Sequence, residues 1–262
     1  MMSLARKARV LLSVYHALML EYRAEIYLWA LSNVLPLIMM GLWVTAAGRA
    51  DYGLSPGELG SYFVAVFIVR QYTTVWVIWE FEYDLLHGRL SPMLLQPLDP
   101  AWRYVSLHAG EKIARTPFAA AIVGGLLWWY PPARWSPGAV DVLLCMVAVA
   151  GAFTLRFLMQ YAAAMLGFWY ERSSSVEGLF FLPYLFLSGL VAPLELFPPV
   201  VRDLAWWTPF PYLLHLPARL MLGQTEGAVS GLTVMGVWIA VFWLLQRWAW
   251  RRGLRRYSSM GA

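Results

Sequence analysis

The side chains that could carry out chemistry are few in this sequence, and none of them forms a recognisable catalytic motif. The two lysines, Lys7 and Lys112, do not close a GxxxxGK[ST] loop, so the chain has no P-loop for ATP. The four histidines are scattered and form no HExxH motif, so no metal site is predicted. No GxSxG sequence occurs, and RSSSVEG at 172–178 is better interpreted as a turn than as a nucleophile site. A membrane enzyme with dispersed catalytic residues stays open as an alternative.

Two arginines are more informative than these scattered groups. Arg70 and Arg156 fall near the middle of apolar segments, where a charge is costly and is often functional. No acidic residue lies in the middle of an apolar segment, so the sequence offers the arginines no obvious carboxylate partner there. One hypothesis is a basic cavity on a translocation pathway that receives an anionic or amphiphilic molecule. The other is a structural role, in which the arginines bind backbone carbonyls or pair across a dimer.

The composition is typical of a membrane protein. Of the 262 residues, 60% are hydrophobic and 13% are charged, whereas soluble domains are nearer half apolar and a quarter charged. The net charge is +5, but the basic residues cluster at the edges of apolar segments, which argues against binding to nucleic acid. The single cysteine, Cys145, excludes a disulfide within the chain. We expect one all-α integral membrane domain over residues 1–262.

Six segments approach the roughly 20 apolar residues that a helix needs to cross a bilayer. Transmembrane helices are predicted at 26–47, 59–79, 114–131, 140–167, 178–192 and 227–246. Residues 1–25 do not resemble a signal peptide, because His16 and Glu21 interrupt their apolar part. Their apolar side chains share one helical face, which predicts an amphipathic helix lying along the membrane surface.

The distribution of Arg and Lys predicts the orientation in the membrane. With a cytoplasmic N-terminus, most basic residues outside the predicted spans are cytoplasmic, and the exceptions are Arg49, Arg134, Arg202 and Arg219. Both termini are therefore predicted to be cytoplasmic, with residues 80–113 as the main cytoplasmic loop. The basic C-terminal tail would lie against anionic lipid or act only as a topology anchor.

This loop contains a short apolar segment between a glycine and several prolines. Gly88 can end the second span in the left-handed conformation, Ser91 suits an N-cap, and Pro92 suits the first helical position. The residues MLL at 93–95 would then form a short helix, which is not stable alone in water. Its exposed apolar tip predicts a pocket on another protein, unless the loop folds back onto the membrane.

Residues 193–226, on the predicted outer side, are rich in proline and aromatic residues. They are too apolar to be fully solvated and too interrupted to form two more spans. We expect one or two short helices that dip partway into the outer leaflet, where irregular backbone is tolerated if protein covers it.

These segments together resemble a permease subunit of the type-2 ABC (ATP-binding-cassette) exporter superfamily over nearly the whole chain. The resemblance rests on LEYRAEIYLWALSNVLPLIMMGLW, on GRLSPMLLQP and on LFLSGLVAPLELFPPVVRDLAWWTPFPYLLHLPARLMLG. The second stretch is similar to the Gly-x-Leu-x-x-Leu-Leu-x-x-Pro pattern of those permeases. The resemblance implies a six-span half-transporter in a bacterial inner membrane. It also implies a second permease, identical or related, and two cytoplasmic ATPases that bind ATP and Mg, so that this chain needs no cofactor of its own.

The resemblance also implies roles for particular residues. The cytoplasmic loop would carry a coupling helix that docks in an ATPase groove through Gly88, Arg89, Leu90, Ser91, Met93, Leu94, Leu95 and Gln96. Further polar contacts would come from Glu80, Glu82 and Asp84. Outer re-entrant helices over 193–222 would gate the exit, with Pro193, Glu195, Pro198, Pro209 and Pro211.

The predicted function is thus the membrane subunit of an ATP-driven exporter of a hydrophobic or amphiphilic molecule, with Arg70 and Arg156 on the translocation pathway. Two other functions stay open. One is a membrane-embedded enzyme that modifies lipids, and the other is the membrane subunit of an ABC importer.

Overall fold

A computed structural model describes residues 10, 13–14, 17, 33–170 and 172–257 of the chain. Within these residues all regular elements are helices, so the predicted all-α class is confirmed. The predicted interfacial helix at 1–25 and the beginning of the first span lie almost entirely outside the described residues.

The helices follow one another along the described chain with short connections. The α-helices are α3 (Leu35–Ala47), α4 (Pro56–Thr73), α5 (Val77–Leu86), α6 (Leu90–Leu94), α7 (Pro100–Trp129), α8 (Ala139–Ala164), α9 (Glu177–Leu187), α10 (Pro199–Trp206), α11 (His215–Met221) and α12 (Ala228–Leu254). Short 3₁₀ helices lie between some of them: η1 (Pro131–Ala133), η2 (Met165–Phe168), η3 (Ser173–Val176), η4 (Leu194–Leu196) and η5 (Phe210–Leu213).

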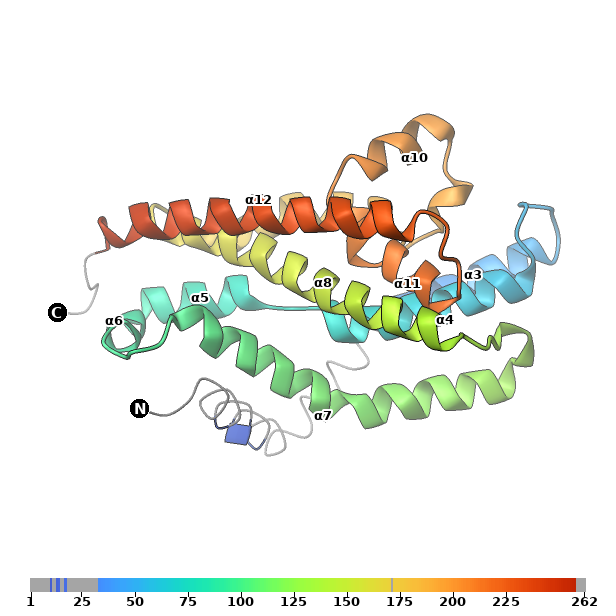
Figure 1. The fold of residues 1–262 in the computed structure, drawn as a ribbon, viewed down its shortest axis with the longest axis horizontal. Helices are drawn as coiled ribbons and strands as arrows, with labels where there is room; N and C mark the ends of the chain where they lie inside the picture. The colour runs from blue at the N-terminus through green and yellow to red at the C-terminus, as the bar shows by residue number, and fades with distance from the viewer. Residues whose placement is uncertain (1–9, 11–12, 15–16, 18–32, 171, 258–262) are drawn as a thin grey trace.

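The long helices form an elongated bundle (Figure 1). Helix α12 lies beside α8, and α3 lies beside α4. Helix α6 and the C-terminal end of α12 lie at one end of the bundle, which we call the α6 end. The α3–α4 and α7–α8 connections lie at the opposite end, and α10 projects from the bundle towards that side. We call it the α10 end.

Three stretches are long and apolar enough to cross a membrane: Pro56–Leu86, Ala139–Phe168 and Ala228–Leu254. They coincide with the second, fourth and sixth predicted spans. The shorter apolar helices Leu35–Ala47 and Ser173–Leu187 correspond to the described part of the first span and to the fifth. The total of six spans stays a prediction.

Helix α7 runs across the predicted boundary between the cytoplasmic loop and the third span at 113/114, and the position of that boundary stays a prediction. It is continuous over 30 residues, and Asp99 caps its start by accepting a hydrogen bond from the Ala101 N–H at 3.0 Å. Because α5 ends at Leu86, only residues 87–99, including α6, connect the two longer helices. Pro117 inside α7 has no N–H to donate, and Figure 1 shows the helix changing direction along its length.

The helix over the second predicted span, 59–79, is interrupted. Helix α4 ends at Thr73 and α5 begins at Val77, with Thr74 in an extended conformation at φ −64° and ψ 132°. The β-branched run Thr73–Val75 favours extended backbone only weakly, and neither proline nor glycine marks the break. The interruption therefore depends on contacts with other helices.

The α6 end of the core is built from aromatic rings. Phe81 of α5 makes edge-to-face contacts with Tyr104, Tyr161, Phe168 and Trp250, which come from α7, α8, η2 and α12. These contacts pack α5 against α7, α8, η2 and α12. α5 is therefore held in the bundle by packing as well as by its polar contacts.

Gly253 of α12 tests this packing. A Cβ at position 253 would overlap the Phe168 ring, whereas a Cβ at Gly236, on the same helix, would meet no atom within 4 Å. We expect Gly253→Ala to destabilise the protein by about 1–3 kcal/mol through overpacking. Gly236→Ala should be neutral or stabilising by up to about 1 kcal/mol, because alanine favours helix. Thermal unfolding in dodecyl maltoside measures both, and equal shifts in the two variants would contradict the close contact.

Candidate functional site

Helix α6 is a single turn at the α6 end of the bundle. Gly88 has φ +67°, which confirms the predicted left-handed glycine after α5. The predicted N-cap was wrong, because the helix already begins at Leu90 and its N-cap, Arg89, makes no capping hydrogen bond through its side chain. The Ser91 hydroxyl instead lies 3.0 Å from the Tyr257 hydroxyl, beyond the end of α12.

The side chains of α6 divide into an anchored face and a free face. Leu90 and Met93 are buried in the bundle, whereas Leu94 is 37% exposed and Leu95 is 88% exposed. Of the residues predicted to dock a partner, Leu90 and Met93 therefore contact this chain itself. Those with exposed side chains are Arg89, Leu94, Leu95 and Gln96.

The carboxylates of α5 bind other parts of this chain. Glu82 accepts hydrogen bonds from the Ser174 N–H at 2.6 Å and the Ser174 hydroxyl at 2.9 Å. Asp84 accepts one from the Tyr104 hydroxyl at 2.8 Å. Glu80 lies 3.2 Å from a ring nitrogen of His108. These contacts fix α5 to η3 and α7, so the polar contacts predicted for a partner already serve the fold.

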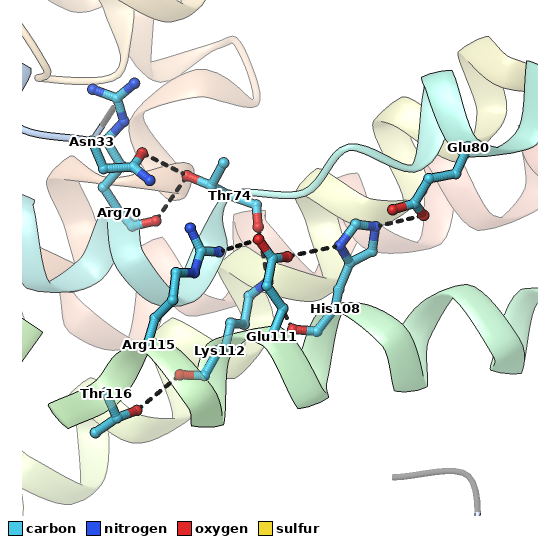
Figure 2. Close-up of polar contacts among 9 residues, drawn as sticks. All are labelled: Asn33, Arg70, Thr74, Glu80, His108, Glu111, Lys112, Arg115 and Thr116. Carbon is cyan, nitrogen blue, oxygen red and sulfur yellow. Dashed lines mark hydrogen bonds and ion pairs between the residues drawn. The ribbon is translucent and has the colours of Figure 1, made fainter. Parts of the chain in front are cut away.

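A row of polar side chains on α7 lies buried against the break between α4 and α5 (Figure 2). Glu111 lies between two basic groups, 3.5 Å from His108 Nδ1 and 3.1 Å from Arg115 Nη2. We did not predict this cluster, because His108 and Glu111 were assigned to the loop 80–113 and Arg115 to the start of the third span. The signal is present in the sequence as the spacing 108, 111 and 115, which places the three side chains on one helical face.

Lys112 of the same helix binds the non-helical backbone between α4 and α5. Its ammonium donates a hydrogen bond to the Thr74 carbonyl at 2.8 Å. The Arg70 carbonyl keeps its helical hydrogen bond from the Thr74 N–H at 3.1 Å, and it also accepts from the Thr74 hydroxyl at 2.8 Å. The Thr74 carbonyl, which lies in the break, is thus satisfied by a side chain from α7.

Beside the break lies a cavity of about 540 Å³ between α4, α5, α8 and α9. Arg70 and Arg156, which the sequence singles out separately, both line it. Nε and Nη1 of Arg70 and Nη1 of Arg156 are buried and have no hydrogen-bond partner within the described part of the chain, and the Arg156 guanidinium lies 4.2 Å from the Tyr184 ring centroid. Glu177, the first residue of α9, lines the same cavity. A carboxylate is therefore near the arginines, at a helix end rather than in the middle of a span.

The proline-rich segment at the α10 end forms two α-helices and two 3₁₀ helices. Helix α11 is buried in the bundle, whereas α10 exposes Val200, Leu204 and Trp207. The predicted gate prolines lie at the turns of this segment: Pro193, Pro198 and Pro209 are N-caps of η4, α10 and η5, and Pro211 lies within η5.

A polar network fastens this segment to α4. Tyr62 donates a hydrogen bond to the Gly189 carbonyl at 2.9 Å, and its oxygen also lies 2.9 Å from His215 Nδ1. The other ring nitrogen of His215 lies 3.4 Å from Glu195, which is 3.7 Å from Arg219. Gly189 has φ +83°, and a Cβ there would collide with the Tyr62 hydroxyl, so this close approach needs glycine. Glu195, predicted as a gate residue, is thus the acidic member of this network.

Comparison with known families decides what kind of protein carries these features. The family model described as ABC-2 family transporter protein matches residues 54–261. The chain belongs to the ABC-2 transporter family. The predicted resemblance to type-2 ABC permeases is confirmed by this match. The curated proteins contain no match to the chain.

Membership in the ABC-2 family makes the chain a transmembrane subunit of an ABC transporter, and it implies an ABC ATPase as partner. In the described part of this ABC-2 permease, α6, the cavity and the Glu195–His215 network lie at different positions in the bundle. Helix α6 lies at one end, α5 leads from it to the break and the cavity, and the network of Glu195 and His215 holds the segment between α9 and α12.

The ion pair between Glu111 and Arg115 on α7 can be tested by removing one of its two charges. In Glu111→Gln the Arg115 side chain, 1% exposed, loses the carboxylate that lies 3.1 Å away. An unpaired buried charge costs about 3–5 kcal/mol, so the free energy of unfolding in mixed micelles should fall by about that amount.

Adding Arg115→Met to Glu111→Gln removes the unpaired charge, so the double variant should be more stable than Glu111→Gln alone. Arg103→Met, at an exposed position of the same helix, is the control and should change stability little. Wild-type stability of Glu111→Gln would show that Arg115 does not depend on this carboxylate.

The Glu195 carboxylate predicts a dependence on pH. Burial raises the pKa of Glu195, but the hydrogen bond and charge of His215, helped by a backbone hydrogen bond and Arg219, lower the pKa to about 2. The folded-state pKa is thus below the ordinary value of 4.5, and ionised Glu195 stabilises the permease above pH 4.5. This stabilisation is lost as the pH falls from 4.5 to about 2.

We expect Glu195→Gln to lower the melting temperature at neutral pH and the difference from wild type to shrink within that window. The measurement is thermal unfolding of both proteins in detergent from pH 7 to pH 2. A difference that stays constant across the whole range would refute the role of the ionised carboxylate.

Proposed function

We propose that this ABC-2 permease exports a hydrophobic or amphiphilic molecule from the cytoplasm or the inner leaflet of a bacterial inner membrane. Separate ATPases bind ATP and Mg and dock on α6, within the segment 80–113. The observation that carries this proposal is the exposed apolar tip of α6, at the end of a rigidly held helix that leads to the cavity.

The tip of α6 suits insertion into a pocket of the ATPase. Leu94 and Leu95 project into the surroundings, while Leu90 and Met93 hold the same turn in the bundle. A helix of five residues gains little stability of its own, so this anchoring fixes the direction of the two leucines. A preorganised apolar contact loses little conformational entropy on binding, which favours a stable docking interaction.

Docking at α6 can reach the cavity through α5. Helix α5 supplies Ile78 and Trp79 to the cavity wall, and its Glu82 binds η3, which directly precedes α9. A displacement of α6 by the ATPase would therefore move two walls of the cavity together. ATP binding would shift the permease between two arrangements of these walls through their different contacts with the ATPase.

The orientation follows from the basic residues. Arg251 and Arg252 lie in the last turn of α12, at the α6 end, and Arg89 and Arg103 lie near α6. An excess of arginine is typical of the cytoplasmic side, so the α6 end faces the cytoplasm and both termini lie there. The α10 end faces outward, where the segment 193–222 acts as the exit gate.

The complete transporter contains a second permease, identical or related, and two ATPases. Exposed apolar side chains on α9, such as Leu179 and Leu182, and on α12, such as Val237 and Leu244, are available to lipid or to that second permease. Export is supported by the similarity of the segment from span five to span six to that of exporters.

Docking is tested with Leu94→Asp and Leu95→Asp together, in a permease co-expressed with its partner ABC ATPase. Charged side chains cannot enter an apolar pocket, so binding of the ATPase should weaken at least tenfold, or about 1.4 kcal/mol. Co-purification and ATP hydrolysis in nanodiscs measure the loss.

Leu204→Asp is the matched control, because Leu204 is a 60% exposed leucine on α10. It should leave ATPase binding unchanged, and all variants should keep the wild-type melting temperature. Normal ATPase binding by the Leu94 and Leu95 double variant would disprove docking through this tip.

A further inference from the structure

The cavity beside the break presents more positive than negative charge to a ligand. We propose that it binds an amphiphile with one anionic headgroup, held by Arg70 and Arg156, and an apolar tail that lies against the aromatic wall. This inference rests on the proposed transport function, because such an amphiphile would be the class of molecule that the permease exports.

The charges lining the cavity indicate an anion. Arg70 and Arg156 bring two guanidinium groups to one space, and three of their nitrogens are buried with no hydrogen-bond partner among the described residues. The one carboxylate among the lining residues is Glu177, and both of its oxygens already accept from the Gln160 amide, at 3.0 and 2.9 Å. Two cations and one anion give the described lining residues a net charge of +1, which favours a negatively charged headgroup.

The donor geometry suits an oxyanion. Guanidinium groups bind carboxylates and phosphates through several N–H donors, and these charge-assisted hydrogen bonds are stronger than neutral ones. Burial without partners is costly for such donors, so an oxyanion between the two arginines would remove a penalty as well as form new bonds. Cation–π contact with Tyr184 holds Arg156 in place without using its N–H groups.

The rest of the lining is apolar and aromatic. Phe180, Tyr184 and Phe210 contribute rings, and Trp76 and Trp79 lie with their ring centroids 5.5 Å apart. The volume of about 540 Å³ is within the range of roughly 300–1,000 Å³ that is typical of ligand sites. An anion without a tail would leave most of this wall unused.

The cavity also has an apolar rim. Trp79 on α5 and Phe181 on α9 line it and are 40% and 53% exposed at the surface of the bundle. Exposed aromatic side chains on helices that cross a membrane face lipid, so a ligand could enter between α5 and α9 from the bilayer. This route suits a molecule that already has its tail in the membrane.

The test uses the purified permease without ATPase, in phosphatidylcholine nanodiscs, with radiolabelled dodecyl phosphate as the probe. Two competitors separate headgroup from tail: dodecylphosphocholine has the same tail but no net charge, and inorganic phosphate has no tail. We expect dodecyl phosphate to bind, and both competitors to displace it at least tenfold more weakly than unlabelled dodecyl phosphate.

Variants then assign the headgroup site. Arg70→Ala and Arg156→Ala should each weaken binding about tenfold or more, as the loss of a charge-assisted hydrogen bond predicts. Glu177→Gln should strengthen binding severalfold, because it removes the negative charge from the cavity, and misfolding cannot produce such a gain. Arg251→Ala, at an exposed position on α12, is the control and should bind as wild type does.

Several results would overturn the inference. These are no binding of dodecyl phosphate, wild-type binding by both arginine variants, or equal competition by dodecylphosphocholine. Equal competition by inorganic phosphate would instead identify a site for a free anion. Because the probe assay contains no ATPase, its failure together with normal docking through Leu94 and Leu95 would reject only the ligand class. Normal probe binding together with failed docking would reject the ATPase contact at α6.

Discussion

The hydrogen bond from the Lys112 ammonium to the Thr74 carbonyl makes the interrupted second span possible. A helix that breaks inside a bilayer leaves carbonyl groups without partners, and each unsatisfied group costs several kcal/mol where water is absent. Lys112 supplies a donor at 2.8 Å from a neighbouring helix. The buried ammonium in turn needs negative charge nearby, and Glu111 and Glu80 line the same part of the bundle. The shape of α4 and α5 therefore depends on α7.

The break has a consequence for the cavity. Because the chain is extended at Thr74, Arg70 on α4 and Trp76 and Trp79 beyond the break all reach one space, which a continuous helix would not place in the same way. The charge that enters this space from α8, Arg156, comes from the opposite wall. Along the chain, the Thr74 carbonyl that accepts from Lys112 lies between Arg70 and α6. Helix α5 connects this carbonyl to α6, and packing and hydrogen bonds hold α5 in the bundle.

The properties of single residues in the sequence pointed to Gly88, Arg70 and Arg156, but not to the break in the second span or to the polar cluster on α7. The left-handed Gly88 followed from the conformational freedom of glycine, and Arg70 and Arg156 followed from the cost of charge within apolar segments. The break did not, because the sequence Thr-Thr-Val is compatible with a helix and only the donor from Lys112 makes an extended turn acceptable. His108 and Glu111 were assigned to the loop 80–113 and Arg115 to the start of the third span, so the cluster was missed. Its polar side chains are buried by pairing with one another rather than by hydrophobicity.

Arg70 and Arg156 differ from other buried basic residues of the bundle in the partners that the fold gives them. In the described part of the chain, Arg115 faces Glu111 and Lys112 faces a carbonyl, so the fold supplies partners to buried cations in the helices around the cavity. Glu177 could have served Arg156 in the same way, yet its oxygens accept from Gln160. Among the described residues, the guanidinium groups of Arg70 and Arg156 therefore make no ion pair with a carboxylate, although Glu177 lines the same cavity. A partner that comes and goes would explain this difference, because a permanent internal ion pair would compete with it for the same donors.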